Sequence, residues 1–248
     1  MDELILYYGV NLPARDRTRE LCDTTVVLQP YHPLCQSGAF TDYFPHARRF
    51  VYWNPTGVSP CALPEDGPRL PILGYDDTWG LYRLDLSKTV ARRFVADSGR
   101  HALNTPGVHG VFIDDLDRWT HESGRRHGRA VIRALTEGRR QIDLFVNRGF
   151  AFWARLPNLW AVLVEDLTPH AIDRMSPQET TWINRMVLPA LRRARIAGIA
   201  AHSITYDPTA IGWQPSSATA AEFSRLVSEP LLGRIHLDHW PDALSERN

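Results

Sequence analysis

The chain of 248 residues is poor in lysine and cysteine. Lys88 is its single lysine, and because 28 basic residues balance 28 acidic ones, no overall charge would recruit nucleic acid or an anionic membrane. The three cysteines form no Cys-x-x-Cys pair, so they indicate neither a disulfide framework nor a zinc ribbon. Binding is therefore expected at a local site.

Long apolar runs and nucleotide-binding motifs are also lacking. No segment approaches membrane-spanning length, and the start, Met1-Asp2-Glu3, has neither the positive segment nor the apolar core of a signal peptide. The chain as given is predicted to be soluble and cytoplasmic, or secreted if a signal has been removed. No Gly-x-Gly-x-x-Gly or Gly-x-x-x-x-Gly-Lys follows an expected strand, which argues against a nucleotide-binding sheet.

Apolar segments alternate with helix-length connections along the chain. This alternation predicts an α/β fold with a parallel sheet, and at this length a single (β/α)8 TIM barrel over residues 1–248 is favoured over an open sheet. Residues 56–81, rich in Pro and Gly, are expected to form a long loop over the barrel mouth. The eight expected strands are 4–9, 24–28, 50–53, 82–86, 111–113, 141–146, 159–164 and 199–205.

The segment 107–119 carries the strongest functional signal. Its apolar run, 111–113, is typical of a strand buried on both faces, and Asp114, Asp115 and Asp117 follow at once. Since unpaired carboxylates are costly to bury, they should lie at the carboxyl end of the strand, where α/β folds bind ligands. A single Asp at this position would be explained more simply as the N-cap of a helix, but three carboxylates favour a ligand-binding site.

Side chains just past the other strands should converge on the same end of the barrel. Carboxylates and amides bond sugar hydroxyls and aromatic rings stack on sugar faces, whereas a phosphate site would need Arg, Lys or backbone amides. The sequence thus predicts a carbohydrate site. The residues expected to bind substrate are Tyr8, Trp53, Asp85, Asp115, Asp117, Asn147 and Tyr206, with Asp207 as a further candidate.

Several of these residues also have a structural explanation. Trp53 fits a core position, Asp85 fits the approach to a helix, and Tyr8 and Tyr206 fit packing at the barrel rim. His109 precedes its strand, so it is expected at the opposite end from the acids, in a structural role.

Asp114 and Glu165 fit the carboxylic acid and the carboxylate that glycosidic cleavage requires. Both directly follow buried strands that lie two apart in the expected ring, although Glu165 could also cap a turn. A separation of about 5 Å between the carboxyl groups would imply retention of configuration, and roughly 6.5 to 9.5 Å would imply inversion. The sequence leaves open which residue is the acid, and whether Asp115 or Asn147 holds the substrate or orients the acid.

The segment 107–119, GVHGVFIDDLDRW, resembles a signature of the endo-α-1,4-polygalactosaminidase family, glycoside hydrolase family 114, whose relatives include spherulin-4-like and Pel-polysaccharide hydrolases. Shorter segments at 84–86, 146–149 and 164–165 are similar to other motifs of that family. The resemblance implies metal-free hydrolysis of a microbial exopolysaccharide of α-1,4-linked amino sugars of the galactosamine type.

In that family the matching acids form the catalytic pair, which the resemblance carries over to Asp114 and Glu165. The chain departs from the signature at His109, where the family has Asp, and at Asp115, where it has Asn. The extra charge beside Asp114 would raise a neighbouring pKa and could change the preferred sugar.

Two other functions stay open at this point. The acidic cluster, Asp114, Asp115, Asp117 and Glu165, could bind Mg²⁺ or Ca²⁺ in a metal-dependent hydrolase or lyase, which EDTA would inactivate. Alternatively, the chain could be a noncatalytic carbohydrate-binding barrel, which would bind oligosaccharides without producing new reducing ends. Both as a glycoside hydrolase and as a noncatalytic barrel, the protein is expected to bind a polysaccharide or oligosaccharide. It is expected to be a monomer.

Overall fold

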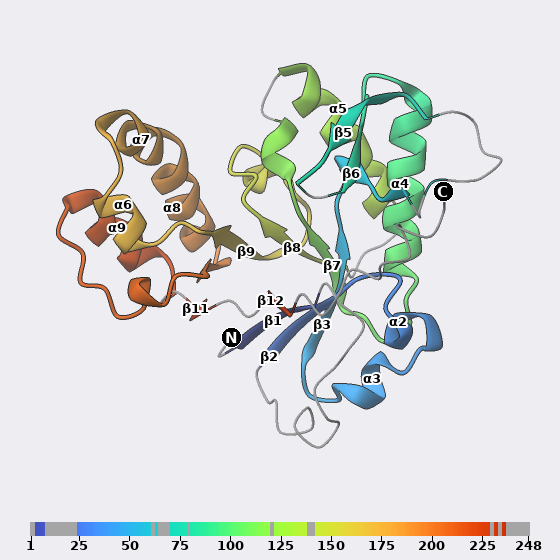
Figure 1. Cartoon of the computed structure of the whole chain (residues 1–248), viewed down its shortest axis with the longest axis horizontal. Coiled ribbons are helices and arrows are strands. Elements are labelled where there is room, and N and C mark those ends of the chain that lie inside the picture. The colour runs from blue at the N-terminus through green and yellow to red at the C-terminus, as the bar shows by residue number, and fades with distance from the viewer. Residues whose placement is uncertain are drawn as a thin grey trace.

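The computed structural model describes residues 3–7, 24–60, 63, 70–78, 80–119, 122–137, 142–228, 231–232 and 235–236. Its main feature is a sheet in the order β11-β10-β9-β8-β7-β3-β2-β1-β12, in which every neighbouring pair is parallel (Figure 1). The predicted α/β fold with a parallel sheet is therefore confirmed. The strands are β1 (Glu3–Tyr7), β2 (Thr24–Leu28), β3 (Arg48–Trp53), β7 (Gly110–Ile113), β8 (Asp143–Asn147), β9 (Leu159–Glu165), β10 (Ala200–Thr205), β11 (Leu231–Leu232) and β12 (Ile235–His236).

The two ends of this sheet belong to one short stretch of chain. β11 pairs with β10 at one end and β12 pairs with β1 at the other, yet only residues 233–234 separate them in the sequence. The described residues thus form a curled parallel sheet, and its closure into an eight-stranded barrel stays a prediction.

The expected fourth strand, 82–86, does not join the parallel sheet. It corresponds to β6 (Leu81–Leu84), which pairs antiparallel with β4 (Gly57–Val58) and β5 (Ile72–Asp76) in a separate three-stranded sheet. The alternation of apolar and polar residues in YRLDL is typical of an antiparallel strand with one covered face, so the assignment to a parallel sheet was wrong. The expected loop at 56–81 likewise contains β4 and β5, and 61–62, 64–69 and 79 lie outside the described residues.

Helices flank the main sheet in three groups (Figure 1). In the view of Figure 1, one group lies beside β9 and β11, a second beside the three-stranded sheet, and a third beside the first strands. The predicted helix at 13–21 lies outside the described residues. The helices are α2 (Pro33–Ser37), α3 (Phe40–Tyr43), α4 (Thr89–Leu103), α5 (Glu122–Thr136), α6 (Pro169–Asp173), α7 (Pro177–Trp182), a π-helical turn (Ile183–Val187), α8 (Leu188–Ile196) and α9 (Ala218–Leu226).

The central strands β2, β7 and β8 are buried on both faces, as their largely apolar sequences predict. Val111 and Ile113 of β7 belong to the core between the sheet and its helices, whereas Phe112 points to the other face. Strand residues alone make up the fully buried cluster on that second face, which we call the inner face. Its members are Val27, Phe50, Phe112, Phe145, Ala161, Leu163 and Ile204.

Candidate active site

The candidate site continues the inner face beyond the ends of the strands. Because successive strand residues point to opposite faces, a residue two positions after an inner-face residue lies on the same side. Asp114 follows Phe112 at this spacing, and Tyr52 of β3 follows Phe50. Asn147, Glu165 and Tyr206 follow Phe145, Leu163 and Ile204 in the same way at the ends of β8, β9 and β10. These five side chains therefore meet at the carboxyl ends of neighbouring strands.

The amide of Asn147 joins the two predicted catalytic acids. Its Nδ2 donates to Asp114 Oδ1 at 3.0 Å and to Glu165 Oε2 at 2.7 Å. The lengths of these two bonds limit the separation of the two oxygens to about 5.7 Å. Asn147 is only 4% exposed, and its Nδ2 must face the acids because carboxylates only accept. The two acids are thus held close together by one shared donor.

A tyrosine hydroxyl completes the environment of each acid. Tyr52 donates to Asp114 Oδ2 at 2.8 Å, and Tyr206 donates to Glu165 Oε1 at 2.8 Å. Burial and the adjacent Glu165 carboxylate raise the pKa of Tyr206 above its usual value, so this hydroxyl keeps its proton. Sequence reasoning proposed Tyr206 but missed Tyr52, although the alternation along β3 places Tyr52 on the inner face.

Residues in the left-handed conformation follow each of the three central site residues. Asp115 has a φ of 57°, Arg148 of 54° and Asp166 of 54°, directly after Asp114, Asn147 and Glu165. This conformation costs non-glycine residues on the order of 1 to 3 kcal/mol each and is concentrated at functional sites. The same strained turn thus ends β7, β8 and β9 and fixes the direction of the preceding side chain.

Asp114 is held in an environment that favours its protonated form. Burial, followed by the charges of Asp115 and Glu165, raises the pKa of Asp114 to about 6, against the opposing effect of hydrogen bonds from Tyr52 and Asn147. The backbone N–H of Asp115 also donates to Asp114 Oδ1 at 2.8 Å. A carboxyl group with this pKa can donate a proton near neutral pH, as a general acid must.

The other two acids of the segment 107–119 have supporting contacts. Asp115 Oδ2 accepts from Asn54 Nδ2 at 2.9 Å, and Asn54 Oδ1 in turn accepts from the backbone N–H groups of Thr56 and Gly57. Asn54, which sequence reasoning did not single out, therefore connects Asp115 to β4. The predicted acid cluster is in this way linked to the three-stranded sheet.

Asp117 supports the turn after β8. Its Oδ1 accepts from the backbone N–H of Gly149 at 2.6 Å, and burial raises its pKa. Gly149 has a φ of 69°, and a Cβ there would lie 2.7 Å from Cβ of Leu116, so only glycine fits. Arg148 beside it donates to the backbone oxygen of Glu165 at 2.9 Å. Asp117 therefore orders the loop that presents Asn147.

The remaining predicted substrate-binding residues lie elsewhere. Trp53 is 4% exposed, belongs to the core beneath α4 and donates from Nε1 to Ser98 Oγ at 3.1 Å, so alternation along β3 turns it away from the acids. Asp85 accepts from the backbone N–H of Ser87 at 2.9 Å, and hydrogen bonds from the side chain and then the backbone of Ser87 lower its pKa. Its carboxylate stabilises the turn before α4. Tyr8 lies outside the described residues.

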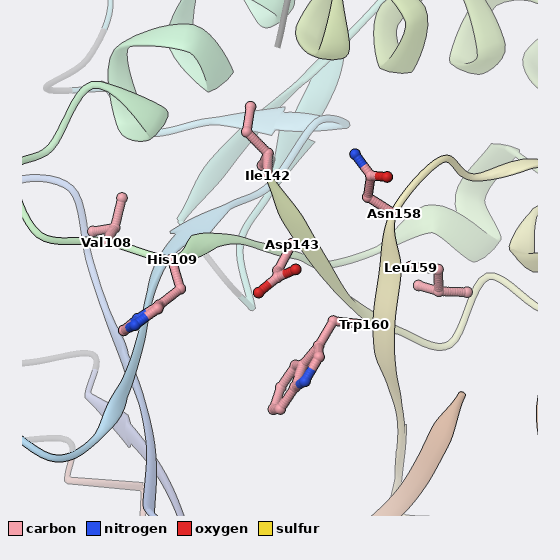
Figure 2. Close-up of a pocket in the computed structure, with 7 residues that line it drawn as sticks. All are labelled: Val108, His109, Ile142, Asp143, Asn158, Leu159 and Trp160. Carbon is pink, nitrogen blue, oxygen red and sulfur yellow. The ribbon is translucent and has the colours of Figure 1, made fainter. Parts of the chain in front are cut away.

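A hollow of about 580 Å³ lies at the opposite end of the strands (Figure 2). His109 lies there, as predicted, and its Nδ1 accepts from the backbone N–H of Arg49 at 3.0 Å. The Arg48 guanidinium lies 4.4 Å from the centre of the Trp160 ring and pairs with Asp143, so these side chains already have partners. The residues lining the hollow are Val108, His109, Ile142, Asp143, Asn158, Leu159 and Trp160.

Two substitutions should move the pKa of Asp114 in opposite directions. Tyr52→Phe removes a hydrogen bond that favours the carboxylate, so the pKa of Asp114 is expected to rise above about 6. Asp115→Asn removes a neighbouring negative charge, so this pKa is expected to fall. Carboxyl-carbon NMR titration of the two variants and the wild type measures both shifts. Shifts of the same sign, or none, would show that these groups do not control Asp114.

The described part of the chain contains neither a membrane-spanning helix nor a cluster of metal ligands. Its helices include none that is long and apolar enough to cross a membrane. Among the same residues, no group of three or more His, Cys, Asp or Glu side chains is arranged to hold a metal ion.

The fold is similar to that of glycoside hydrolase domains of known structure. The glycoside hydrolase domain of PelA from Pseudomonas aeruginosa matches with a TM-score of 0.62 at 22% identity, over 83% of this chain and 84% of that one. Ega3 from Aspergillus fumigatus, in complex with galactosamine, matches with a TM-score of 0.59 at 14% identity, over 96% and 92%. The GH20 β-N-acetylhexosaminidase from Streptomyces coelicolor matches with a TM-score of 0.51 at 12% identity, over 93% and 58%.

No protein-family model and no curated protein sequence matches the chain. At these identities the structural matches establish a shared fold. The resemblance to the endo-α-1,4-polygalactosaminidase family is confirmed at that level.

Proposed function

We propose that the protein is a retaining glycoside hydrolase that cleaves an α-1,4-linked amino-sugar polysaccharide of the galactosamine type. The main support for this proposal is that the buried amide of Asn147 donates hydrogen bonds to both Asp114 and Glu165. The two oxygens that this amide binds, Asp114 Oδ1 and Glu165 Oε2, are therefore at most about 5.7 Å apart, an upper limit that is compatible with a retaining enzyme. Retaining glycosidases hold their carboxyl groups roughly 5 to 5.5 Å apart, whereas inverting enzymes need more room for a water molecule.

Asp114 is the general acid and Glu165 the nucleophile in this mechanism. The raised pKa of Asp114, about 6, leaves it a proton to give to the glycosidic oxygen as the bond to the anomeric carbon breaks. Glu165 accepts two hydrogen bonds, from Asn147 and Tyr206, which stabilise its carboxylate. That carboxylate attacks the anomeric carbon and forms a glycosyl ester. Asp114, now ionised, then takes a proton from the water that hydrolyses the ester.

The acidic residues around the catalytic pair favour a positively charged substrate. Asp115 and Asp166 stand next to the acid pair, and Asp166 is exposed. Carboxylates in this position attract the ammonium group of an unacetylated amino sugar. The shared fold with Ega3, whose structure holds galactosamine, supports the same substrate class.

A closed (β/α)8 barrel formed by residues 1–248 as a single domain is the scaffold of this proposal. β11 and β12 are two residues apart, and together they act as one strand between β10 and β1. Counted in this way the barrel has eight strands, and β11 with β12 replaces the strand that the sequence predicted at 82–86. Tyr206 and Asp114 already lie at one edge of the sheet through their contacts with Glu165 and Asn147, and closure would make that edge the open end of the barrel.

Product stereochemistry tests the proposed mechanism. Proton NMR of the first products from an α-1,4-linked galactosamine oligosaccharide is expected to show the α-anomer, which later equilibrates with the β-anomer. Initial formation of the β-anomer would mean that water attacks directly, and the assignment of Glu165 as a nucleophile would be wrong. Full activity after treatment with EDTA is also expected, because no step of this mechanism uses a metal ion.

A further inference from the structure

One large aromatic side chain is exposed in a loop at the same end of the sheet as the acid pair. Trp213, in the segment between β10 and α9, is 41% exposed. We propose that its indole ring is the stacking platform for one sugar unit of the substrate chain, at a subsite beside the cleavage point. This inference rests on the proposed function, since it takes the ligand to be an amino-sugar oligosaccharide.

The Trp213 ring is fixed before any ligand binds. Its Nε1 donates to Asp173 Oδ2 at 2.9 Å, and the ring centroid lies 4.5 Å from that of His170. Both partners belong to α6, whereas Trp213 belongs to the loop after β10. A side chain that is already held in place loses little conformational entropy when a ligand binds. The two contacts of the Trp213 ring therefore favour its use as a surface on which a ligand stacks.

Asp173 holds the whole loop in the same way. Besides Trp213, its carboxylate accepts from the backbone N–H groups of Ser216 at 2.8 Å and Ser217 at 2.9 Å. One carboxylate thus ties three points of the loop to α6. The indole N–H has its partner, so the exposed part of the ring is carbon, which suits the C–H face of a sugar.

A short series of contacts leads from Trp213 to the catalytic pair. His170, which packs against the Trp213 ring, lies 3.6 Å from Asp207, measured between Nδ1 and Oδ2. Asp207 follows Tyr206, whose hydroxyl donates to Glu165. Since α6 follows β9 and the loop follows β10, Trp213 lies at the same end of the sheet as the acids. Our proposal places one unit of a polymer bound at the acid pair over this ring.

Binding measurements in an inactive protein test this subsite. Calorimetry with galactosamine oligosaccharides of increasing length compares Glu165→Gln with Glu165→Gln carrying Trp213→Ala. Loss of the ring is expected to weaken binding of the longer oligosaccharides by roughly fivefold to tenfold, and binding of the monosaccharide much less. Trp213→Phe keeps a ring and should recover most of the affinity. Ile211→Ala is the matched control, because Ile211 is exposed to a similar extent, 43%, in the same loop.

The outcomes separate this inference from the proposed function. Equal affinities with and without Trp213, in proteins whose melting temperatures agree, would overturn the platform. Equal losses for Trp213→Ala and Ile211→Ala would overturn it as well, because they would point to the loop and not to the ring. Suppose that Trp213→Ala weakens binding of the longer oligosaccharides but the wild-type protein cleaves none of them. That result would support the subsite and contradict the proposed hydrolase activity.

Discussion

Asp114→Asn is expected to lower kcat at least about a hundredfold and, at pH 7, to make the protein more stable. The loss of activity follows because an amide has no proton to give to the leaving oxygen. The gain in stability follows from the environment of Asp114, whose pKa is raised to about 6 by burial and by its acidic neighbours. A neutral amide of the same shape avoids that unfavourable charge.

The sign and the pH range of this stabilisation follow from linkage. Between its ordinary pKa, 3.8, and about 6, Asp114 holds a proton in the folded state and loses it in the unfolded state. The stability of the wild type therefore falls as the pH rises through this range. The advantage of Asp114→Asn should be absent near pH 3.5 and reach on the order of 2 kcal/mol above pH 7.

Denaturant unfolding at several pH values, together with steady-state kinetics, measures both effects. Glu165→Gln is the companion variant and is expected to lose a similar factor in kcat while remaining folded. Near wild-type kcat in either variant would remove that residue from the catalytic pair. An Asp114→Asn protein that is less stable than the wild type at pH 7 would contradict the described environment of Asp114.

Asn147→Asp is expected to be the most destabilising substitution in the site. Asn147 is buried and donates to both acids, so the variant would place a third carboxylate where a donor is needed. An uncompensated buried charge costs on the order of 3 to 5 kcal/mol. Protons relieve this repulsion, so the variant should bind more protons when folded, and its stability should recover as the pH falls towards 5.

Asn147→Leu is the matched control, because it removes the donor without adding a charge. Both variants should lose activity, since neither holds Asp114 and Glu165 at a fixed distance. Only the Asp variant should show the steep dependence of stability on pH, which chemical denaturation at pH 5, 6, 7 and 8 would measure. Parallel stability curves for the two variants would mean that Asn147 does not lie between the acids.

Much of the site could be predicted from strand ends alone. Asp114, Asn147, Glu165 and Tyr206 each lie at or directly after the end of a largely buried strand, and parallel strands carry such residues to one edge of a sheet. The choice of Trp53 went wrong because it took the last residue of β3. The alternation along that strand, in which Phe50 faces inward, instead selects Tyr52.

Other features gave no usable sequence signal. β11 and β12 are two residues each, too short for any periodicity to be recognised. The left-handed turns at Asp115, Arg148 and Asp166 contain no glycine at the left-handed position, so no glycine in the sequence marks them. The joint hydrogen bonding of Asn147 to both acids depends on the register of β8 between β7 and β9, which no local pattern encodes.

Cleavage of a defined substrate tests the central claim most directly. The purified protein is incubated with a soluble α-1,4-linked galactosamine oligosaccharide, and the chain lengths are followed by mass spectrometry. The account predicts shorter oligosaccharides with the wild type and none with Glu165→Gln. An unchanged oligosaccharide after prolonged incubation with folded wild-type protein, or equal cleavage by both proteins, would contradict it.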